Sequence, residues 1–283
     1  MAEDSALSPE FKERYGPWAL IAGGSEGIGE AFACQMAAVG MNIVLLARRA
    51  PPLDSLAEKL RRDYRVEVRT LAVDLTAPDL LTQVSAITRD IEVGMLIYNA
   101  GATIGYNRFY DWKLEDLDFM MRLNCLAPVH LAHHFSQGMV QRGKGGMMFL
   151  TSAAAFAGSS HMAIYPATKA FDHLFAEGLW HDLKPAGIDC LSLVVGATKT
   201  PSHQHVDFSK LNPALKDGGA MACEDVAREG LSQLGQYPTW IVGEHNRARF
   251  PASYAQDRRK LIEGMSLATA AINDLEHISA FDT

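Results

Sequence analysis

The chain is short of cysteine and of long apolar runs, and each shortage excludes a class of protein. Its cysteines lie far apart with no Cys-x-x-Cys spacing, which favours reduced thiols over disulfides or a zinc site: Cys34, Cys125, Cys190 and Cys223. No apolar run reaches the roughly 18 residues that a membrane-spanning helix needs. The first residues carry acid and lack a basic, apolar signal, so we expect a cytoplasmic protein that has no contact with a membrane.

Positive charge is also scarce. Lys and Arg total 26 against 33 Asp and Glu, which gives a net charge of −7 and argues against a nucleic-acid partner. His203 and His205 would share a face of an extended segment, but no carboxylate or cysteine cluster accompanies them, so we expect no metal site. The length of 283 residues permits one large domain or two small ones, and the absence of a linker or internal repeat favours one.

Near the N-terminus a strand, a glycine-rich turn and a helix follow one another. Residues 18–22 are apolar as in a buried strand, and residues 30–39 have the apolar spacing of a helix. Glycines allow a backbone to approach a pyrophosphate, and a helix N-terminus offers unpaired N–H groups, although a plain tight turn would also use glycine. The spacing is Gly-x-x-x-Gly-x-Gly, not the commoner Gly-x-Gly-x-x-Gly. The predicted cofactor contacts of this turn are Gly23, Ser25, Gly27, Ile28 and Gly29.

Two arginines follow the second predicted strand, residues 42–47. An acidic residue about 20 positions after the glycines would accept hydrogen bonds from an NAD ribose, whereas arginine there suits a 2′-phosphate. Arg48 and Arg49 therefore predict NADP(H) as the cofactor. The alternative is a pair of solvated arginines before a helix, and only one of the two need face the ligand.

The ends of the next two predicted strands supply further cofactor contacts. Residues 66–73 end at Asp74 and Leu75, and Asp74 either accepts a hydrogen bond from an adenine amino group or begins the next turn. Residues 94–98 end in small residues that leave room for a cofactor ring against the backbone: Asn99, Ala100 and Gly101.

A tyrosine four residues before a lysine predicts a proton-transfer site. On a helix, Tyr165 and Lys169 share one face, and an ammonium beside a phenol favours the phenolate. Ser152 ends an apolar run that is typical of a buried strand, so the three polar groups should converge. The Tyr-x-x-x-Lys pattern alone also occurs by chance on exposed helices.

Strands and helices alternate along the chain, which predicts an α/β protein with a single doubly wound, Rossmann-type parallel sheet and helices on both faces. We expect an N-terminal arm over residues 1–16, packed on the surface or frayed. Residues 17–245 form the dinucleotide-binding and catalytic domain, including a mobile substrate loop over 201–222. Residues 246–283 form a C-terminal helical tail whose function the sequence does not indicate. A long helix over 114–135 is expected to break near Pro128.

Over about residues 15–245 the chain resembles the short-chain dehydrogenase/reductase family. The glycine turn and the Asn-Ala-Gly turn match two of its motifs, and four residues match its catalytic tetrad: Asn124, Ser152, Tyr165 and Lys169. Three positions depart from the family's usual threonine, asparagine and proline: Ala22, Tyr98 and Val195. These departures lie beside the cofactor loop, so they bear on its rigidity and not on proton transfer.

The resemblance assigns a role to each matched residue. Tyr165 would give a proton to a ketone under reduction and take it back in oxidation, while Lys169 tunes the phenol and holds the nicotinamide ribose. Ser152 would donate to the substrate oxygen, and Asn124 would anchor a water. A turn after the strand over 189–195 would contact the nicotinamide: Gly196, Thr198 and Thr200. Members of the family also assemble as homodimers or homotetramers.

A narrower resemblance concerns the substrate. Residues 15–21, 40–44 and 200–202 are similar to bacterial 7β-hydroxysteroid dehydrogenases, which use NADP and act on bile-acid hydroxyls. The expected function is therefore NADP(H)-dependent interconversion of a ketone and a secondary alcohol on a small apolar or steroid-like substrate. One alternative is an enoyl reductase, although enzymes of that kind space tyrosine and lysine more widely. Another is a catalytically silent, cofactor-sensing protein, which the intact tetrad disfavours.

Overall fold

The computed structural model describes residues 7–204, 206–211, 214–249 and 257–275. Within these residues, seven parallel strands form one sheet in the order β3-β2-β1-β4-β5-β6-β7. In chain order the strands are β1 (Trp18–Ala22), β2 (Asn42–Ala47), β3 (Val68–Ala72), β4 (Val93–Tyr98), β5 (Gly145–Ser152), β6 (Ile188–Val195) and β7 (Thr239–Ile241). The predicted doubly wound parallel sheet is confirmed, and the two apolar runs predicted as its first strands coincide with β1 and β2.

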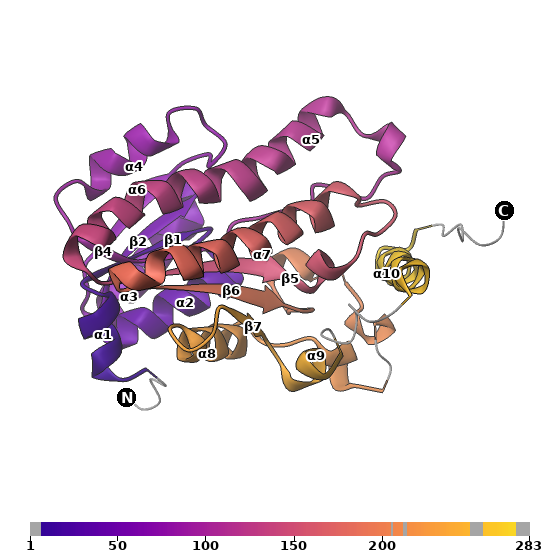
Figure 1. Cartoon of the computed structure of the whole chain (residues 1–283). Helices are drawn as coiled ribbons and strands as arrows, with labels where there is room; N and C mark the ends of the chain where they lie inside the picture. The colour runs from indigo at the N-terminus through magenta and orange to yellow at the C-terminus, as the bar shows by residue number, and fades with distance from the viewer. Residues whose placement is uncertain (1–6, 205, 212–213, 250–256, 276–283) are drawn as a thin grey trace.

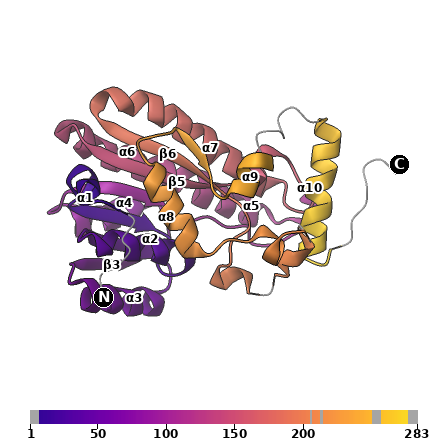
Figure 2. The same ribbon diagram turned by 90° about the horizontal axis from the view of Figure 1, so that it is seen from below.

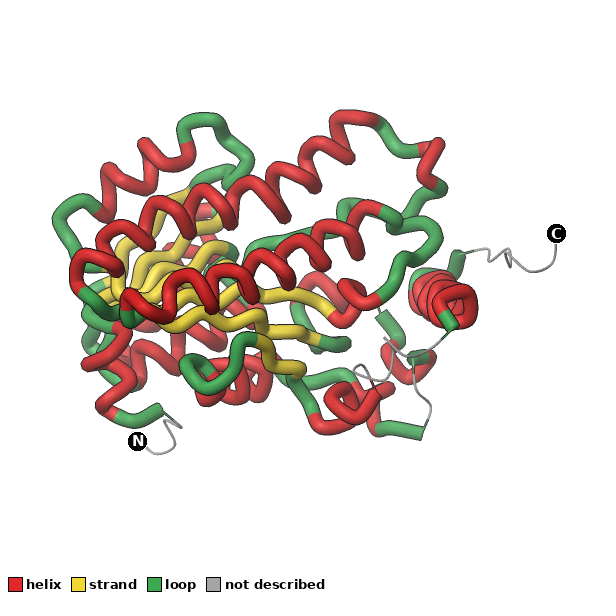
Figure 3. Tube along the Cα trace, in the orientation of Figure 1, coloured by secondary structure: helices red, strands yellow, loops and turns green. Residues whose placement is uncertain are grey.

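Helices cover both faces of the sheet, as Figures 1 and 3 show. They are α1 (Pro9–Tyr15), α2 (Gly27–Ala38), α3 (Ala50–Tyr64), α4 (Leu80–Thr88), α5 (Leu114–Met121), α6 (Ala127–Arg142), α7 (Ile164–Leu183), α8 (Cys223–Gln233), α9 (Glu244–Arg249) and α10 (Arg258–Ile272). On one face α2, α3 and α8 bury Phe32, Leu53 and Val226 against the strands. On the other face α4, α6 and α7 form a second apolar core. Both faces of the strands are therefore apolar, which explains their continuous hydrophobic runs.

The chain reverses its direction of travel across the sheet between β1 and β4. It proceeds from β1 outward to β3, and then returns to place β4 beside β1, where Ala22 pairs with Tyr98. The turns that follow these two strands, at Gly23 and Asn99, are therefore neighbours. Open α/β sheets bind ligands at such a switch point, beyond the carboxyl ends of the strands.

The long helix expected over residues 114–135 is interrupted near Pro128, as predicted. The break is a π-helical turn, Arg122–Leu126, between α5 and α6, and Pro128 lies in the first turn of α6, where proline fits. The amide of Asn124 holds this turn: Nδ2 donates to the Ala102 carbonyl at 3.0 Å and to Thr168 Oγ1 at 3.0 Å. Pro128 lacks an N–H and crowds the carbonyl of Asn124, so the proline and the hydrogen bonds of Asn124 act at the same turn.

The described part of the N-terminal segment is a helix that packs on the sheet. Tyr15 ends α1 and is buried, and its hydroxyl donates to Asp189 Oδ2 at 2.8 Å. Arg14 Nε donates to the same oxygen at 2.6 Å, and Lys184 Nζ donates to Oδ1 at 2.8 Å. Asp189 lies near the start of β6, so this cluster closes the amino end of the sheet, opposite the switch point.

The C-terminal helix α10 lies at the other end of the molecule, beside the loop that precedes α7 (Figure 2). Thr269 Oγ1 lies 2.7 Å from Ser159 Oγ, and Ser266 Oγ accepts from the Ser160 backbone N–H at 2.9 Å. Within the segment for which the sequence indicated no function, α10 is therefore fixed to the loop at Ser159 and Ser160. Among the helices of the described residues, none combines the length and apolar character needed to cross a bilayer.

Candidate active site

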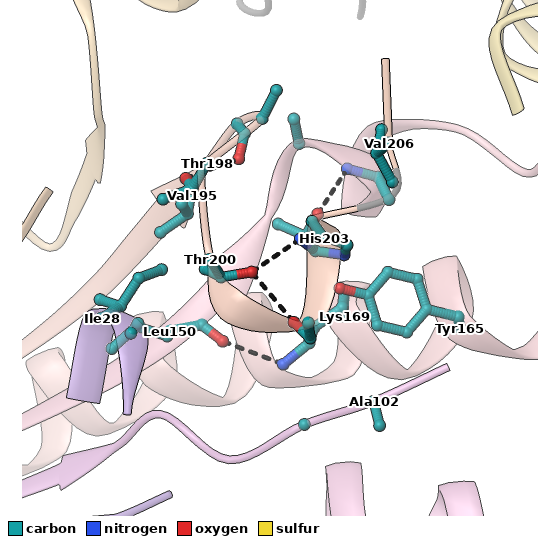
Figure 4. A pocket seen from close by; sticks show the side chains of 18 of the residues that line it. Ile28, Ala102, Leu150, Tyr165, Lys169, Val195, Thr198, Thr200, His203 and Val206 are labelled. Atoms are coloured by element: carbon teal, nitrogen blue, oxygen red, sulfur yellow. Dashed lines mark hydrogen bonds between the residues drawn. The ribbon is translucent and has the colours of Figure 1, made fainter. Parts of the chain in front are cut away.

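A cavity of about 760 Å³ opens at the carboxyl ends of β1, β4, β5 and β6 (Figure 4). One part of its wall comes from the glycine turn and the two arginines, and another from α7, α10 and the loop after β6. The cavity thus runs from the switch point of the sheet to the C-terminal helix, and its volume suits a dinucleotide together with a small molecule.

The glycine turn is closed too tightly for side chains. Gly23 has φ +81°, and a Cβ there would lie 2.8 Å from the backbone nitrogen of Ala100. A Cβ on Gly29 would lie 2.1 Å from the Gly23 carbonyl oxygen, which instead accepts from Asn99 Nδ2 at 2.7 Å. The asparagine therefore braces the turn at the start of α2. Such a cradle, open to a helix N-terminus, fits a pyrophosphate.

The structure brings most of the predicted turn residues to the cavity. Its wall includes Gly23, Ser25, Gly27, Ile28, Asn99, Ala100 and Gly101. Gly29 stands behind the turn and permits its closure. Glu26, which was not predicted from the sequence, also lines the cavity.

Both arginines after β2 line the same cavity. The guanidinium carbon of Arg48 lies 5.9 Å from the centre of the Phe119 ring, and Arg49 Nη2 lies 2.7 Å from Glu26 Oε1. Arg49 is thus engaged by a carboxylate of the glycine loop, while Arg48 stacks on an aromatic ring, a geometry that leaves the edge of its guanidinium available.

Asp74 and Leu75 were both predicted to contact the cofactor, but they occupy different positions relative to the cavity. Leu75 lines the cavity. Asp74 Oδ1 accepts from the backbone N–H of Thr76 at 2.9 Å and from its hydroxyl at 2.8 Å, and Asp74 is not among the residues of the cavity wall. The turn-forming interpretation of Asp74 therefore accounts for its hydrogen bonds, and the adenine contact stays a prediction.

Tyr165 and Lys169 lie one turn apart in the first half of α7 and both line the cavity. Figure 4 shows them pointing into a space that Thr200 and His203 border from another side. Lys169 is buried, and its Nζ donates to the Leu150 carbonyl at 3.0 Å and to Asp172 Oδ2 at 3.1 Å. Gly101 leaves room for this ammonium, because a Cβ there would lie 2.8 Å from Nζ.

The two buried charges on α7 influence each other. Burial by itself would lower the pKa of Lys169, but the Asp172 carboxylate and the Tyr165 phenol outweigh it, so the pKa of the lysine is raised. Burial raises the pKa of the Asp172 carboxyl, and the Lys169 ammonium offsets part of that effect. Asp172 was not predicted from the sequence, because an acid three residues after a lysine on a long helix usually lies in solvent.

Ser152 and Asn124 occupy different positions relative to the cavity. Ser152 is the last residue of β5 and lines the cavity, and its Oγ accepts from the Ala154 backbone N–H at 3.1 Å, which leaves the hydroxyl proton for another partner. Asn124 is buried behind Ala102 and is not part of the wall. Its side chain is hydrogen-bonded to Ala102 and Thr168, and the expected water contact stays a prediction.

The turn after β6 closes the cavity on another side. Gly196, Thr198 and Thr200 all line it. Thr198 Oγ1 donates to the Gly196 carbonyl at 3.1 Å, and Thr200 Oγ1 lies 2.9 Å from His203 Nδ1. His205 lies outside the described residues. Among the residues that the structure does describe, no three His, Cys, Asp or Glu side chains gather closely enough to hold a metal ion.

The distal part of the cavity draws on the substrate loop expected over 201–222, but the part played by α10 was not predicted from the sequence. Apolar side chains of its wall come from the loop before α7, from the loop after β6 and from α10: Met162, Val206, Phe208, Leu211, Met265 and Ile272. The helical tail gave no signal of this role, because the buried positions of α10 are small or polar: Ser266, Thr269 and Ala270. Only the tertiary position of the helix makes it part of the site.

Comparisons with known proteins identify the family and the fold. A family model described as short chain dehydrogenase matches residues 17–210. The chain is 31% identical over 254 residues to a 7beta-hydroxysteroid dehydrogenase of Clostridium sardiniense, with 89% of this chain and 95% of the relative covered. A solved structure of a 7beta-hydroxysteroid dehydrogenase has a TM-score of 0.81 at 27% identity and covers 90% of this chain and 98% of its own. A short-chain dehydrogenase from Sphingobium yanoikuyae, in complex with NADPH, has a TM-score of 0.72 at 29% identity, covering 94% and 99%.

Proposed function

Because the chain belongs to the short-chain dehydrogenase family, we propose that it is an NADP(H)-dependent oxidoreductase that interconverts a ketone and a secondary alcohol. One observation carries the proposal. Ser152, Tyr165 and Lys169 line the same cavity as the glycine turn and the two arginines. A proton donor, a hydroxyl and an ammonium thus lie beside a cradle whose shape suits a dinucleotide.

Each side chain has a defined part in this reaction. In reduction, Tyr165 gives its phenolic proton to the carbonyl oxygen as that oxygen gains charge, and in oxidation the phenolate takes the proton back. Ser152 donates a hydrogen bond to the same oxygen, and Lys169 holds a positive charge next to the phenol. The bound cofactor supplies or accepts the hydride. Asn124 keeps the π-helical turn in place, through its bonds to Ala102 and Thr168.

NADP(H) is preferred in this proposal because of the charge at the end of β2. Arg48 and Arg49 line the cavity where a 2′-phosphate would lie, and guanidinium groups bind phosphate in a bidentate manner. The NADPH complex of the Sphingobium yanoikuyae relative supports the same preference.

The substrate is proposed to be bulky and apolar, of steroid-like size. The distal wall offers Met162, Phe208, Met265 and other apolar side chains, and burying such surface favours a hydrophobic ligand by about 25 cal/mol per Å². The similarity to 7beta-hydroxysteroid dehydrogenases supports the same size class.

A homodimer or homotetramer is proposed to form through α5 and α7, which lie side by side. Their outer surfaces expose large apolar side chains, with Leu114 68% and Leu174 64% exposed, together with Met121 and Phe171. Exposed apolar patches of this kind mark interfaces. Light scattering of the purified protein that returned the mass of a single chain would contradict this part of the proposal.

The decisive experiment measures oxidation of NADPH with a panel of bulky cyclic ketones. We expect turnover that depends on the ketone, with NADH serving less well, and a loss of about 10²-fold or more in Tyr165→Phe. Product analysis with an α,β-unsaturated ketone separates carbonyl reduction from enoyl reduction. Cofactor binding in a thermal-shift assay with no turnover on any ketone would instead favour a cofactor-sensing protein.

A further inference from the structure

Asp172 is a buried carboxylate next to the lysine of the proposed active site. It lies three residues after Lys169 on α7, and the side chains are 1% and 5% exposed, respectively. Oδ2 lies 3.1 Å from Lys169 Nζ. Within the described residues, Oδ1 is buried and accepts no hydrogen bond. The carboxylate thus has one strong contact, and that contact is to a proposed catalytic residue.

The other ionisable groups around this pair stay neutral near physiological pH. Tyr98, from β4, donates its hydroxyl to the Leu123 carbonyl, and burial raises its pKa. Cys125, from the π-helical turn, has its pKa raised to about 11 by burial and by the nearby Asp172 carboxylate. The Tyr165 phenol is among the causes that raise the pKa of Lys169, and burial raises the pKa of the neighbouring Tyr106. Lys169 is therefore coupled to the Asp172 carboxylate on one side and to the Tyr165 phenol on the other.

Stability alone does not account for this arrangement. A buried carboxylate with an unpartnered oxygen carries a desolvation penalty, and replacing buried ion pairs by apolar residues is often neutral or stabilising. Buried polar atoms without partners are rare in folded proteins and tend to mark sites where chemistry requires them. Asp172 therefore has the character of a functional group.

Resting on the function proposed above, we propose that Asp172 is a positioning residue that aims the Lys169 ammonium and partly cancels its charge at Tyr165. An ammonium has three N–H donors. Asp172 and the Leu150 carbonyl engage two of them, so the third has a fixed direction. The cavity lies beside this nitrogen, next to Gly101.

The carboxylate also sets the pH at which the tyrosine and lysine pair gives up its first proton. A nearby negative charge makes proton loss harder, and removing that charge makes it easier. Oxidation of an alcohol needs the phenolate, so its rate rises as pH passes through this ionisation. Loss of the Asp172 charge should therefore move the acidic limb of the oxidation profile to lower pH.

The test compares pH profiles of kcat/KM for alcohol oxidation in the wild type, Asp172→Asn and Asp172→Ser. We expect both variants to shift the acidic limb downward by about one pH unit, which at low pH is about a tenfold gain relative to the plateau. Asp189→Asn is the matched control, because Asp189 is an equally buried carboxylate at the opposite end of the sheet. An acidic limb that stays at the wild-type pH in both Asp172 variants, or moves upward, would overturn the proposal.

A second measurement needs no turnover. The phenolate changes the ultraviolet absorbance of tyrosine, and subtracting the titration of a matched Tyr165→Phe protein isolates one residue among eight tyrosines. The isolated titration should move to lower pH when Asp172→Asn is present, and an unchanged midpoint would refute the inference. A wild type without activity on any ketone would count against the proposed function, while this titration would still decide the role of Asp172.

Discussion

The two ends of the sheet each bury an aspartate, and they treat it differently. At the amino end, both oxygens of Asp189 are partnered, by Arg14, Tyr15 and Lys184. At the carboxyl end, Asp172 has the single partner Lys169, and its second oxygen accepts nothing from the described residues. The same chemical group is thus fully satisfied at one end and half satisfied at the other.

The pKa values of the two carboxyls are shifted in opposite directions, as their hydrogen bonds predict. Burial acts to raise the pKa of Asp189, but hydrogen bonds from Lys184, Tyr15 and Arg14 outweigh it, so the pKa is lowered. Burial raises the pKa of Asp172, and one ammonium does not reverse the effect. The fully hydrogen-bonded carboxylate of Asp189 therefore stabilises the fold, whereas the partly hydrogen-bonded carboxylate of Asp172 acts electrostatically on Lys169.

The largest expected effect belongs to the carboxyl end. Ser152→Ala should lower kcat for ketone reduction by about 10²- to 10³-fold, because it removes a donor to the developing oxyanion. Its unfolding free energy should stay within about 1 kcal/mol of the wild type. Steady-state kinetics and denaturant unfolding measure the two quantities.

Ser192→Ala is the matched control for Ser152. It deletes another hydroxyl, on β6, which lies 2.8 Å from His173 Nδ1. This variant should lose stability and keep its rate. Equal losses of rate in both serine variants would contradict a direct contact between Ser152 and the substrate oxygen.

At the amino end, Asp189→Asn should lower the unfolding free energy by about 3 kcal/mol and leave activity unchanged below its melting temperature. Because the native pKa of Asp189 is lowered, its contribution is complete above about pH 4, the usual value in an unfolded chain, and is lost as pH falls through the native pKa. Denaturant unfolding at neutral and acidic pH checks this. A stability difference that persisted below the native pKa would show that the ion pairs are not its cause.

Replacing an exposed cation at the carboxyl end of the sheet should weaken cofactor binding and leave the free energy of unfolding unchanged. Arg48→Ser should raise the Kd for NADPH by about 10- to 100-fold, as expected for losing hydrogen bonds to a charged phosphate, and should change the Kd for NADH little. Fluorescence titration measures both constants, with Arg49→Ser as the companion variant. If NADPH and NADH weakened equally, Arg48 would not be the 2′-phosphate ligand.

The smallest effect concerns the contact between Glu26 and Arg49, at 2.7 Å on the surface. Glu26→Gln should strengthen NADPH binding by no more than about fivefold, because it releases Arg49 and because exposed ion pairs are worth at most about 1 kcal/mol. The gain should shrink as salt is added. A weaker affinity for NADPH in this variant would instead mean that Glu26 assists the cofactor.

The sequence predicts the parts of the molecule that depend on local pattern. The apolar runs over 18–22 and 42–47 became β1 and β2, because parallel strands are buried on both faces. The spacing of Tyr165 and Lys169 predicted a shared helix face, and both residues line the cavity. The helix break expected near Pro128 is confirmed, but the hydrogen bonds of Asn124 that hold the π-helical turn could not be predicted from local pattern.

What escaped prediction depends on contacts between distant segments. Tyr15 and Asp189 are 174 positions apart, and neither sequence neighbourhood suggests the bond between them. Asp172 resembles an ordinary surface acid until α7 is packed against β5. The contribution of α10 to the distal wall likewise requires its docking on the loop at Ser159 and Ser160.

Because α10 packs at the distal wall, mutations that alter this wall and mutations that alter the proposed redox groups fall in different parts of the chain. The groups proposed to bind the dinucleotide and move the proton precede residue 201, whereas α10 supplies Met265 and Ile272 to the distal wall from beyond the last strand. If the proposed function holds, a mutation on the inner side of α10 changes which substrates bind and leaves the groups proposed for hydride and proton transfer in place. Libraries that vary this helix alone offer a direct way to retarget the protein.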